Sequence, residues 1–170
     1  MFSKLVLLGI VAVSQICVLG GMIVVDGLPY VFGETIRLKV MPVDPRDMFR
    51  GDYSILGYDF TNLGSRKING LDNADRSYWD DVGRDVYIKL VKSEGSDVWT
   101  TQEITTIKPS SGTYLHGVIN GWRVDCGIEA YYVQEGRGRA IDEAVRGGRT
   151  VEAEVAVWQG KAKLKQVIVK

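Results

Sequence analysis

The chain begins with one long apolar run and then changes to alternating apolar and polar positions. Leu5 to Val25 contains no charged residue, and its only strongly polar side chains are Ser14 and Gln15. A helix needs about 20 such residues to cross roughly 30 Å of bilayer hydrocarbon. The pattern predicts a transmembrane anchor over residues 1–26 and a separate domain over residues 27–170.

The residues that flank this run suggest an orientation. Lys4 precedes it and Asp26 follows it, so the positive-inside rule places the amino end in the cytoplasm and the domain outside. A cleaved signal peptide would have a shorter apolar core and an A-x-A-like site, which residues 18–20 (VLG) imitate poorly. A lipoprotein signal would need a small residue before Cys17, where Ile16 stands. We therefore expect an uncleaved signal-anchor.

The anchor joins the domain through few residues, around Gly27-Leu28-Pro29. We therefore expect the domain to sit close to the bilayer. Tyr30 and Phe32 would suit the membrane interface, where aromatic side chains bridge apolar and wet regions.

Beyond this point the alternation has the period of half-buried strands. Residues 85–93 and 98–107 predict one hairpin, and residues 151–169 predict another around Gln159-Gly160, with Glu152 and Glu154 facing outward. Residues 52–60 (DYSILGYDF) have apolar side chains on both faces, so we expect a central strand there.

Further strands are expected in residues 113–121 and 123–133, and a short helix in 139–148 that stops at Gly147-Gly148. The prediction is a mainly β fold with one short helix, preceded by the transmembrane helix. The β part would be a single antiparallel sheet, a sandwich or a barrel-like domain.

The composition of the chain argues against several classes of function. The 21 basic and 21 acidic residues balance, which argues against a nucleic-acid partner because such binding needs a clustered basic excess. Cys126 and His116 are the only cysteine and histidine of the predicted domain, too few for a zinc site. Cys17 falls in the anchor, so we expect no internal disulfide. No cofactor motif is present, and we expect none to be bound.

The most charged stretch is PVDPRDMFRGDY, residues 42–53. Two prolines stiffen it, and the glycine and last aspartate suit a turn, so a purely structural role is one interpretation. Its arginines could instead bind an anion or a partner's carboxylate. Its aspartates could perform acid–base hydrolysis, but the neighbouring arginines would keep them ionised. The aspartates do not have the regular spacing of a calcium-binding loop. No nucleophile-elbow motif accompanies His116, which argues against a catalytic triad.

Residues 51–58 carry the pattern G-D-Y-x-x-L-x-Y, and residues 127–138 read GIEAYYVQEGRG. The two segments resemble the two shared motifs of the GDYxxLxY family, with Gln134 where proline is usual. The resemblance implies a single-pass protein of the bacterial cytoplasmic membrane with its domain outside the cytoplasm. It also implies a multi-pass membrane-protein partner, because such proteins are often encoded beside family members. It implies no activity.

We therefore expect an extracytoplasmic accessory or binding domain that acts with a membrane protein; the alternative is an envelope hydrolase using the aspartates of the first motif. No catalytic or metal-binding residue is assigned. Arg46 or Arg50 is expected to pair with Glu129 or Glu135 and so clasp the two motifs together. The four tryptophans, Trp79, Trp99, Trp122 and Trp158, are candidate interface anchors. The alternative, which we favour for most of them, is packing in the core or at a strand edge. The candidate motif and binding residues are Asp44, Arg46, Asp47, Arg50, Gly51, Asp52, Tyr53, Leu56, Tyr58, Glu129, Tyr131 and Glu135.

Overall fold

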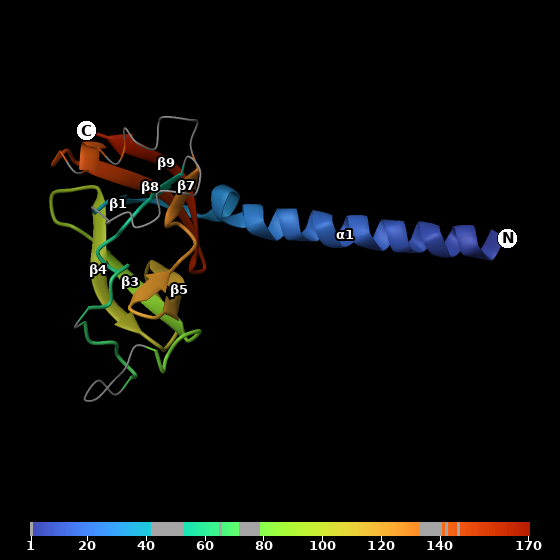
Figure 1. The fold of residues 1–170 in the computed structure, drawn as a ribbon, viewed down its shortest axis with the longest axis horizontal. Helices are drawn as coiled ribbons and strands as arrows, with labels where there is room; N and C mark the ends of the chain where they lie inside the picture. The colour runs from blue at the N-terminus through green and yellow to red at the C-terminus, as the bar shows by residue number, and fades with distance from the viewer. Residues whose placement is uncertain are drawn as a thin grey trace.

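The computed structural model of the protein describes residues 2–41, 53–64, 66–71, 79–132, 141, 143–145 and 147–170. One long helix, α1 (Phe2–Phe32), projects like a rod from one side of a β domain (Figure 1). The predicted fold class, a mainly β fold preceded by an apolar helix of membrane-span length, is confirmed.

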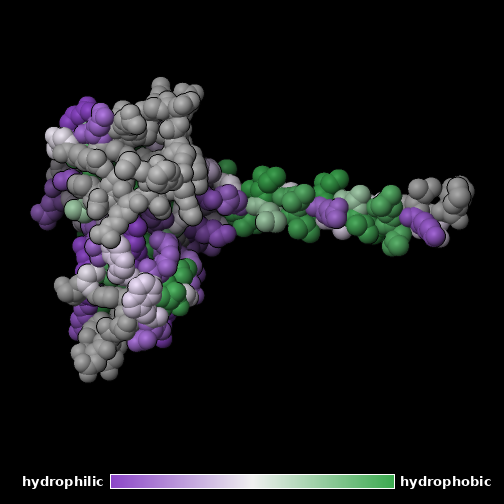
Figure 2. Space-filling view, in the orientation of Figure 1, coloured by the Kyte–Doolittle hydropathy of each residue, from purple (hydrophilic) through white to green (hydrophobic). Residues whose placement is uncertain are grey.

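The helix α1 is apolar on all sides. Its segment Val6–Phe32 is long and apolar enough to cross a membrane, and none of the most apolar window is buried in the protein. Figure 2 shows hydrophobic atoms along most of the helix and mainly hydrophilic atoms on the coloured part of the domain. A helix that is hydrophobic all round needs an apolar surrounding, which the described part of the domain does not supply.

The junction between helix and domain differs from the expected connector. Residues Gly27 to Pro29 are helical, and α1 continues past them to Phe32. Gly33 then donates its backbone N–H to the Pro29 carbonyl at 3.0 Å, and the first strand starts at Glu34. The helix therefore enters the sheet through a single glycine.

Seven strands form the main sheet, in the order β6-β5-β3-β4-β1-β8-β9. They are β1 (Glu34–Lys39), β3 (Asp85–Lys92), β4 (Val98–Thr105), β5 (Tyr114–Asn120), β6 (Arg123–Asp125), β8 (Val151–Trp158) and β9 (Lys161–Val169). Neighbouring strands are antiparallel except for β1 and β4, which are parallel. Both predicted hairpins, β3–β4 and β8–β9, are confirmed.

The sheet is strongly curled, like half of a barrel (Figure 1). The turn between β8 and β9 returns to β5, where Gly160 accepts a hydrogen bond from the His116 backbone N–H at 2.8 Å. Near the start of β1, Glu34 accepts a hydrogen bond from the Thr113 hydroxyl at 2.8 Å. The concave side encloses one apolar core, in which the largest fully buried side chains include Phe60, Ile36, Leu38, Leu56, Leu63, Ile68, Ile88, Leu115, Ile119 and Ile128.

The expected central strand at residues 52–60 is wrong. Among the described residues of this stretch, 53–60, the strand β2 comprises only Tyr53–Ile55, and it pairs with β7 (Ala130–Tyr132) in a separate two-stranded sheet. The residues after it leave strand geometry, and a turn closes between the Thr61 N–H and the Tyr58 carbonyl at 3.1 Å. The apolar residues on both faces reflect a segment that fills the core, which the sequence pattern cannot distinguish from a buried strand.

Two details of the carboxyl-terminal part also emerge. Ala144 is fully buried in a helical segment that includes residues 141 and 143–145, and Gly148 follows it at φ +76°, as expected for a helix end. Glu152, which alternation placed outside, is only 3% exposed. One carboxylate oxygen accepts a hydrogen bond from the Lys170 ammonium at 2.7 Å, and the other is buried without a hydrogen-bond partner among the described residues. The pairing with Lys170 offsets part of the cost of burying this charge.

Candidate functional site

Part of the candidate site lies outside the described residues. This part comprises Asp44, Arg46, Asp47, Arg50, Gly51, Asp52 and Glu135. The predictions made for these side chains, including their pairing with glutamates, stay predictions. The described members are Tyr53, Leu56, Tyr58, Glu129 and Tyr131, and they show how the two motifs meet.

The two motifs lie side by side and are joined through their backbones. In the antiparallel pair of β2 and β7, Tyr53 is opposite Tyr132 and Ile55 is opposite Ala130. The pairing continues beyond the strands, where the Leu56 N–H donates to the Glu129 carbonyl at 2.7 Å. Segments more than seventy residues apart are thus held in register by backbone hydrogen bonds.

Tyr58, the last residue of the first motif, adds a side-chain bond to this contact. Its hydroxyl donates to the Ile128 carbonyl at 2.9 Å, and its ring stacks on Phe60 with centroids 5.3 Å apart. Only 3% of the residue is exposed. Burial raises the pKa of the Tyr58 hydroxyl far above its usual range, and the Glu129 carboxylate adds to the effect. Tyr58 therefore acts as a neutral, buried hydrogen-bond donor.

Glu129 folds back on the turn that precedes it. Its carboxylate accepts the backbone N–H groups of Cys126 at 2.6 Å, Gly127 at 2.8 Å and Ile128 at 2.9 Å. Successive N–H groups that converge in this way form a small anion-binding concavity. Gly127 permits it because its φ of +80° is a conformation that other residues rarely adopt. The described G-I-E residues of the second motif thus build one self-contained turn.

The remaining described motif residues are part of the core. Leu56 and Ile128 are fully buried, and Tyr131 packs against the core with partial exposure. Next to them, Asp59 accepts hydrogen bonds from the N–H and the hydroxyl of Thr101 in β4, both at 2.8 Å. This part of the first motif is a structural clasp between the sheet, β7 and the core.

This geometry bears on the expected ion pair between the motifs. Both Glu129 oxygens already accept backbone N–H groups, so its charge is balanced by the turn itself. The contact between the motifs that the described residues show is made by backbone bonds and the Tyr58 hydroxyl. The expected pairing with Arg46 or Arg50 involves residues outside the described part of the chain and stays a prediction.

Cys126 and His116 lie close in the sheet but face opposite sides. A Cβ added to Gly117 would lie 2.8 Å from the Cys126 sulfur, so the thiol is on the Gly117 side of β5. Since successive strand residues point to opposite faces, His116 points away, where its Nε2 is 2.8 Å from Asp85. Burial raises the pKa of the Cys126 thiol well above its usual range, with contributions from Glu129 and Asp125. It therefore packs as a neutral thiol.

The four tryptophans separate into two pairs. Trp79 is 72% exposed and Trp122 is 49% exposed, whereas Trp99 and Trp158 are half-buried. The Trp79 ring packs over Gly121, where an added Cβ would lie 3.3 Å from it. The Arg123 guanidinium lies 5.3 Å from the centre of the Trp122 ring. Trp79 and Trp122 thus form an aromatic patch at the β5–β6 turn. The patch is taken to include the exposed Val82, because the next residue, Gly83, donates its N–H to the Ile119 carbonyl of β5 at 2.8 Å.

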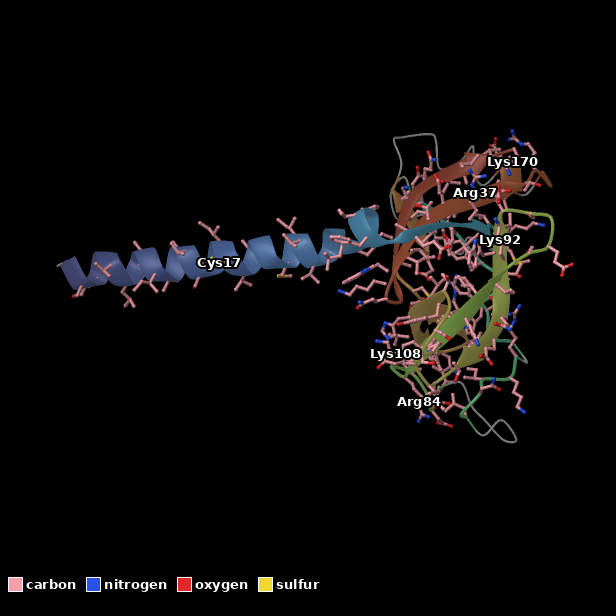
Figure 3. The ribbon with its side chains drawn as sticks, turned by 180° about the vertical axis from the view of Figure 1, so that it is seen from behind. Cys17, Arg37, Arg84, Lys92, Lys108 and Lys170 are labelled. Atoms are coloured by element: carbon pink, nitrogen blue, oxygen red, sulfur yellow. The ribbon has the colours of Figure 1, made fainter. Side chains whose placement is uncertain are left out.

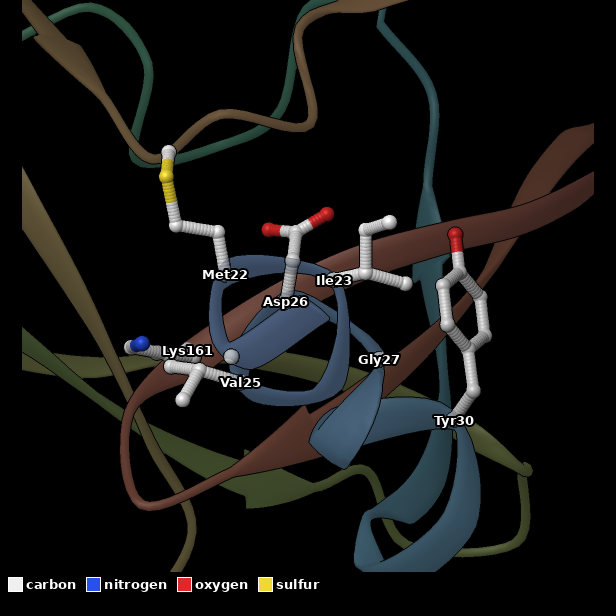
Figure 4. Close-up of a pocket in the computed structure, with 8 residues that line it drawn as sticks. Met22, Ile23, Val25, Asp26, Gly27, Tyr30 and Lys161 are labelled. Carbon is white, nitrogen blue, oxygen red and sulfur yellow. The ribbon is translucent and has the colours of Figure 1, made fainter. Parts of the chain in front are cut away.

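The contact between α1 and the sheet is a feature that the sequence did not indicate. Lys163 of β9 forms an ion pair with Asp26 at 2.6 Å, and the Tyr30 hydroxyl donates to the Leu164 carbonyl at 3.2 Å. Phe32 lies 6.4 Å from the Trp158 ring. These contacts fix the end of the helix on the edge of the sheet and leave an open groove between α1 and Lys161 (Figure 4).

The fold and the clasp define a class of protein: a curled β domain held by an apolar helix of membrane-span length. The chain belongs to the GDYXXLXY protein family, whose model matches residues 15–167. Comparison with curated proteins and with solved structures gives no match. Among the described residues, no three His, Cys, Asp or Glu side chains gather in a way that could hold a metal ion.

Proposed function

We propose that this chain is a single-pass protein of the bacterial cytoplasmic membrane whose β domain lies outside the cytoplasm and acts through a multi-pass membrane-protein partner. The observation that carries the proposal is the exposed apolar helix that enters the sheet without a loop. The helix α1 offers apolar side chains in every direction, and the domain covers none of its most apolar window. Lipid or a partner's helices are the surroundings that such a surface requires.

The short junction supports a role at the membrane surface. From Val25, the end of the apolar run, to Phe32 the helix rises about 10 Å. This distance is comparable to the headgroup layer, which adds about 5–8 Å on each side of the hydrocarbon. The domain is therefore held within reach of other membrane proteins and cannot extend far from the bilayer.

Two surfaces support a protein partner. The aromatic patch of Trp79, Val82 and Trp122 exposes more large apolar side chains than a solvated turn needs, and tryptophan is enriched among residues that dominate binding energy. Within the helix, small residues Ser14, Cys17 and Gly21 lie on one face, a spacing that lets another helix approach closely. Both surfaces suit an accessory protein.

The charged stretch of the first motif supports binding over hydrolysis. Arg46 and Arg50 stand among Asp44, Asp47 and Asp52 in sequence, and nearby positive charge favours ionised carboxylates. A hydrolase of the acid–base kind needs one carboxyl group that keeps its proton near neutral pH. An envelope hydrolase is therefore the second candidate function, and it would replace our proposal if no membrane-protein partner is found.

The test is an affinity purification of the tagged full chain from membranes in a mild uncharged detergent. We expect a multi-pass membrane protein to co-purify with the wild type and to be reduced about ten-fold by Trp79→Ser, because hot-spot truncations cost about 1.4 kcal/mol or more. Val91→Ser is the matched control, since Val91 is also exposed but lies outside the patch. Equal recovery of the same protein with both variants, or no membrane protein at all, would contradict the proposal.

A further inference from the structure

The groove at the base of α1 combines apolar and charged side chains. It is lined by Gly21, Met22, Ile23, Val25, Asp26, Gly27 and Tyr30 of the helix and by Lys161 of β9. In Figure 4, seen along the helix, Lys161 lies beside Val25, while Tyr30 lies on the other side of the helix. A surface that is apolar toward the membrane span and polar toward the domain has the character of a lipid molecule.

The charges at this groove do not cancel. Asp26 is paired with Lys163 at 2.6 Å, and the Lys165 ammonium donates to the Thr35 hydroxyl at 3.3 Å. Lys161 is exposed and forms no ion pair with any carboxylate of the described residues. The groove thus keeps one ammonium group free to bind an anion.

The height of Lys161 along the helix decides which anion it would meet. Lys161 lines the groove together with Val25 and Asp26, the two residues at which the apolar run ends and the polar part begins. A helix with Leu5 to Val25 in the hydrocarbon has this position at the boundary between acyl chains and headgroups. Lipid phosphates lie at this level, and lysine side chains near the ends of spanning helices extend toward it.

We propose that the groove between α1 and β9 binds one anionic phospholipid, with Lys161 at its headgroup phosphate and the acyl chain along Met22 and Ile23. The inference rests on the membrane anchoring in the proposed function, but it does not depend on the protein partner. Lipid is favoured over a partner's helix because the groove ends at a free ammonium group, which an apolar helix would leave unpaired.

A second cation on the same side of the domain agrees with this orientation. Figure 3 shows Lys108 on the side from which α1 leaves, and Lys92, Arg37 and Lys170 on the far side. Lys108 is exposed, so it would also face anionic headgroups when α1 spans the bilayer. The far-side lysine Lys92 pairs with Asp97 at 2.8 Å and provides a matched control.

The test is native mass spectrometry of the full chain, released from an uncharged detergent after addition of equimolar phosphatidylglycerol and phosphatidylcholine. We expect one phosphatidylglycerol to be retained in preference to phosphatidylcholine. Lys161→Gln should reduce this preference about five-fold, the effect of about one lysine near an anionic membrane surface. Lys92→Gln should leave it unchanged, and excess inorganic phosphate should not displace the lipid.

Each other result overturns the inference. Equal retention of the two lipids would show that the site does not select an anionic headgroup. An unchanged preference in Lys161→Gln would show that the lipid binds elsewhere on the protein. Displacement by inorganic phosphate would reduce the site to a general anion site. If lipid preference fails while the chain still resists alkaline extraction from membranes, only this inference is lost. A chain that is extracted as a soluble protein would contradict the anchoring itself.

Discussion

At the scale of single residues, the described letters of the two motifs have physical roles. Leu56 and Ile128 fill the core, and the Tyr58 hydroxyl donates to the Ile128 carbonyl. Glu129 binds three backbone N–H groups of a turn that Gly127 makes possible. A motif whose described part is buried in this way preserves a fold, and the surface chemistry must come from other residues.

Removing one oxygen atom from Tyr58 tests this role. In Tyr58→Phe the buried Ile128 carbonyl loses its hydroxyl partner, and we expect the free energy of unfolding to fall by about 1–3 kcal/mol. Urea unfolding of the full chain in uncharged detergent, followed by near-UV circular dichroism, measures the loss. Tyr30→Phe is the control, because its hydroxyl bond is exposed. Similar losses in both variants would show that the Tyr58 bond has no special weight.

The Glu129 turn makes a separate prediction. Glu129→Gln keeps the size of the side chain but replaces a carboxylate that accepts three N–H groups with an amide that has one acceptor oxygen. Hydrogen bonds to charged groups contribute about 1.5–3 kcal/mol each, so we expect a loss of at least about 2 kcal/mol. Glu94→Gln, on an exposed turn, should change the unfolding free energy by less than about 0.5 kcal/mol. If Glu129→Gln leaves the free energy of unfolding unchanged, the turn does not stabilise the fold.

The raised pKa of the Cys126 thiol predicts that the folded chain is alkylated slowly at this residue. In a Cys17→Ser background, iodoacetamide at about pH 8.5 should modify the folded chain at least about ten-fold more slowly than the urea-unfolded chain. Because the pKa of the Cys126 thiol is higher in the folded than in the unfolded chain, the buried neutral thiol makes its full contribution to the free energy of unfolding below about pH 8.5. This contribution is lost as pH rises through the folded pKa. Mass spectrometry of timed reactions gives the rates. Equal rates would mean that the thiol is open to solvent.

At the scale of elements, the hairpins were predictable and the core-filling segment was not. Alternation located β3, whose buried residues alternate along the strand, and β8, whose sequence alternates apolar and polar residues at its start although both faces are largely buried. Residues 52–60 carry apolar side chains at positions of both faces, so their sequence has no single period from which a strand and a core-filling loop can be told apart. The prediction that Glu152 faces outward was wrong for a related reason. Its partner Lys170 lies beside it only after the hairpin has formed.

The closure of the curled sheet is a property of the β8–β9 turn. Gly160 has a φ of +87°, and an added Cβ would lie 2.6 Å from the Tyr114 ring. We expect Gly160→Ala to lower the free energy of unfolding by about 2–4 kcal/mol, from backbone strain plus the steric clash. Urea unfolding in detergent measures it.

Gly95→Ala separates the two contributions. Gly95 also has a positive φ, +72°, but an added Cβ would meet open space. We therefore expect about 1–2 kcal/mol for strain alone. If both alanine variants lose the same amount, the contact between the turn and β5 contributes nothing to closure.

At the scale of the whole molecule, the junction of helix and sheet determines where the domain works. Asp26 and Lys163 are far apart in sequence, and no local pattern marks them as a pair. The sequence indicated the apolar span and a nearby domain, but the helical junction and the groove between α1 and Lys161 required the three-dimensional structure. Because α1 is fixed to β9 by named contacts, membrane insertion would also set the domain's orientation.

The side of the membrane on which the domain lies is the most direct test of the proposed function. Glu94→Cys, in a chain with Cys17→Ser and Cys126→Ser, places one thiol on the exposed β3–β4 turn. We expect a membrane-impermeant maleimide to label it in intact bacterial cells, after permeabilisation of any outer membrane, with the labelled chain in the membrane fraction. Labelling that appears only after the cytoplasmic membrane is broken, or a labelled chain in the soluble fraction, would contradict an anchored domain outside the cytoplasm.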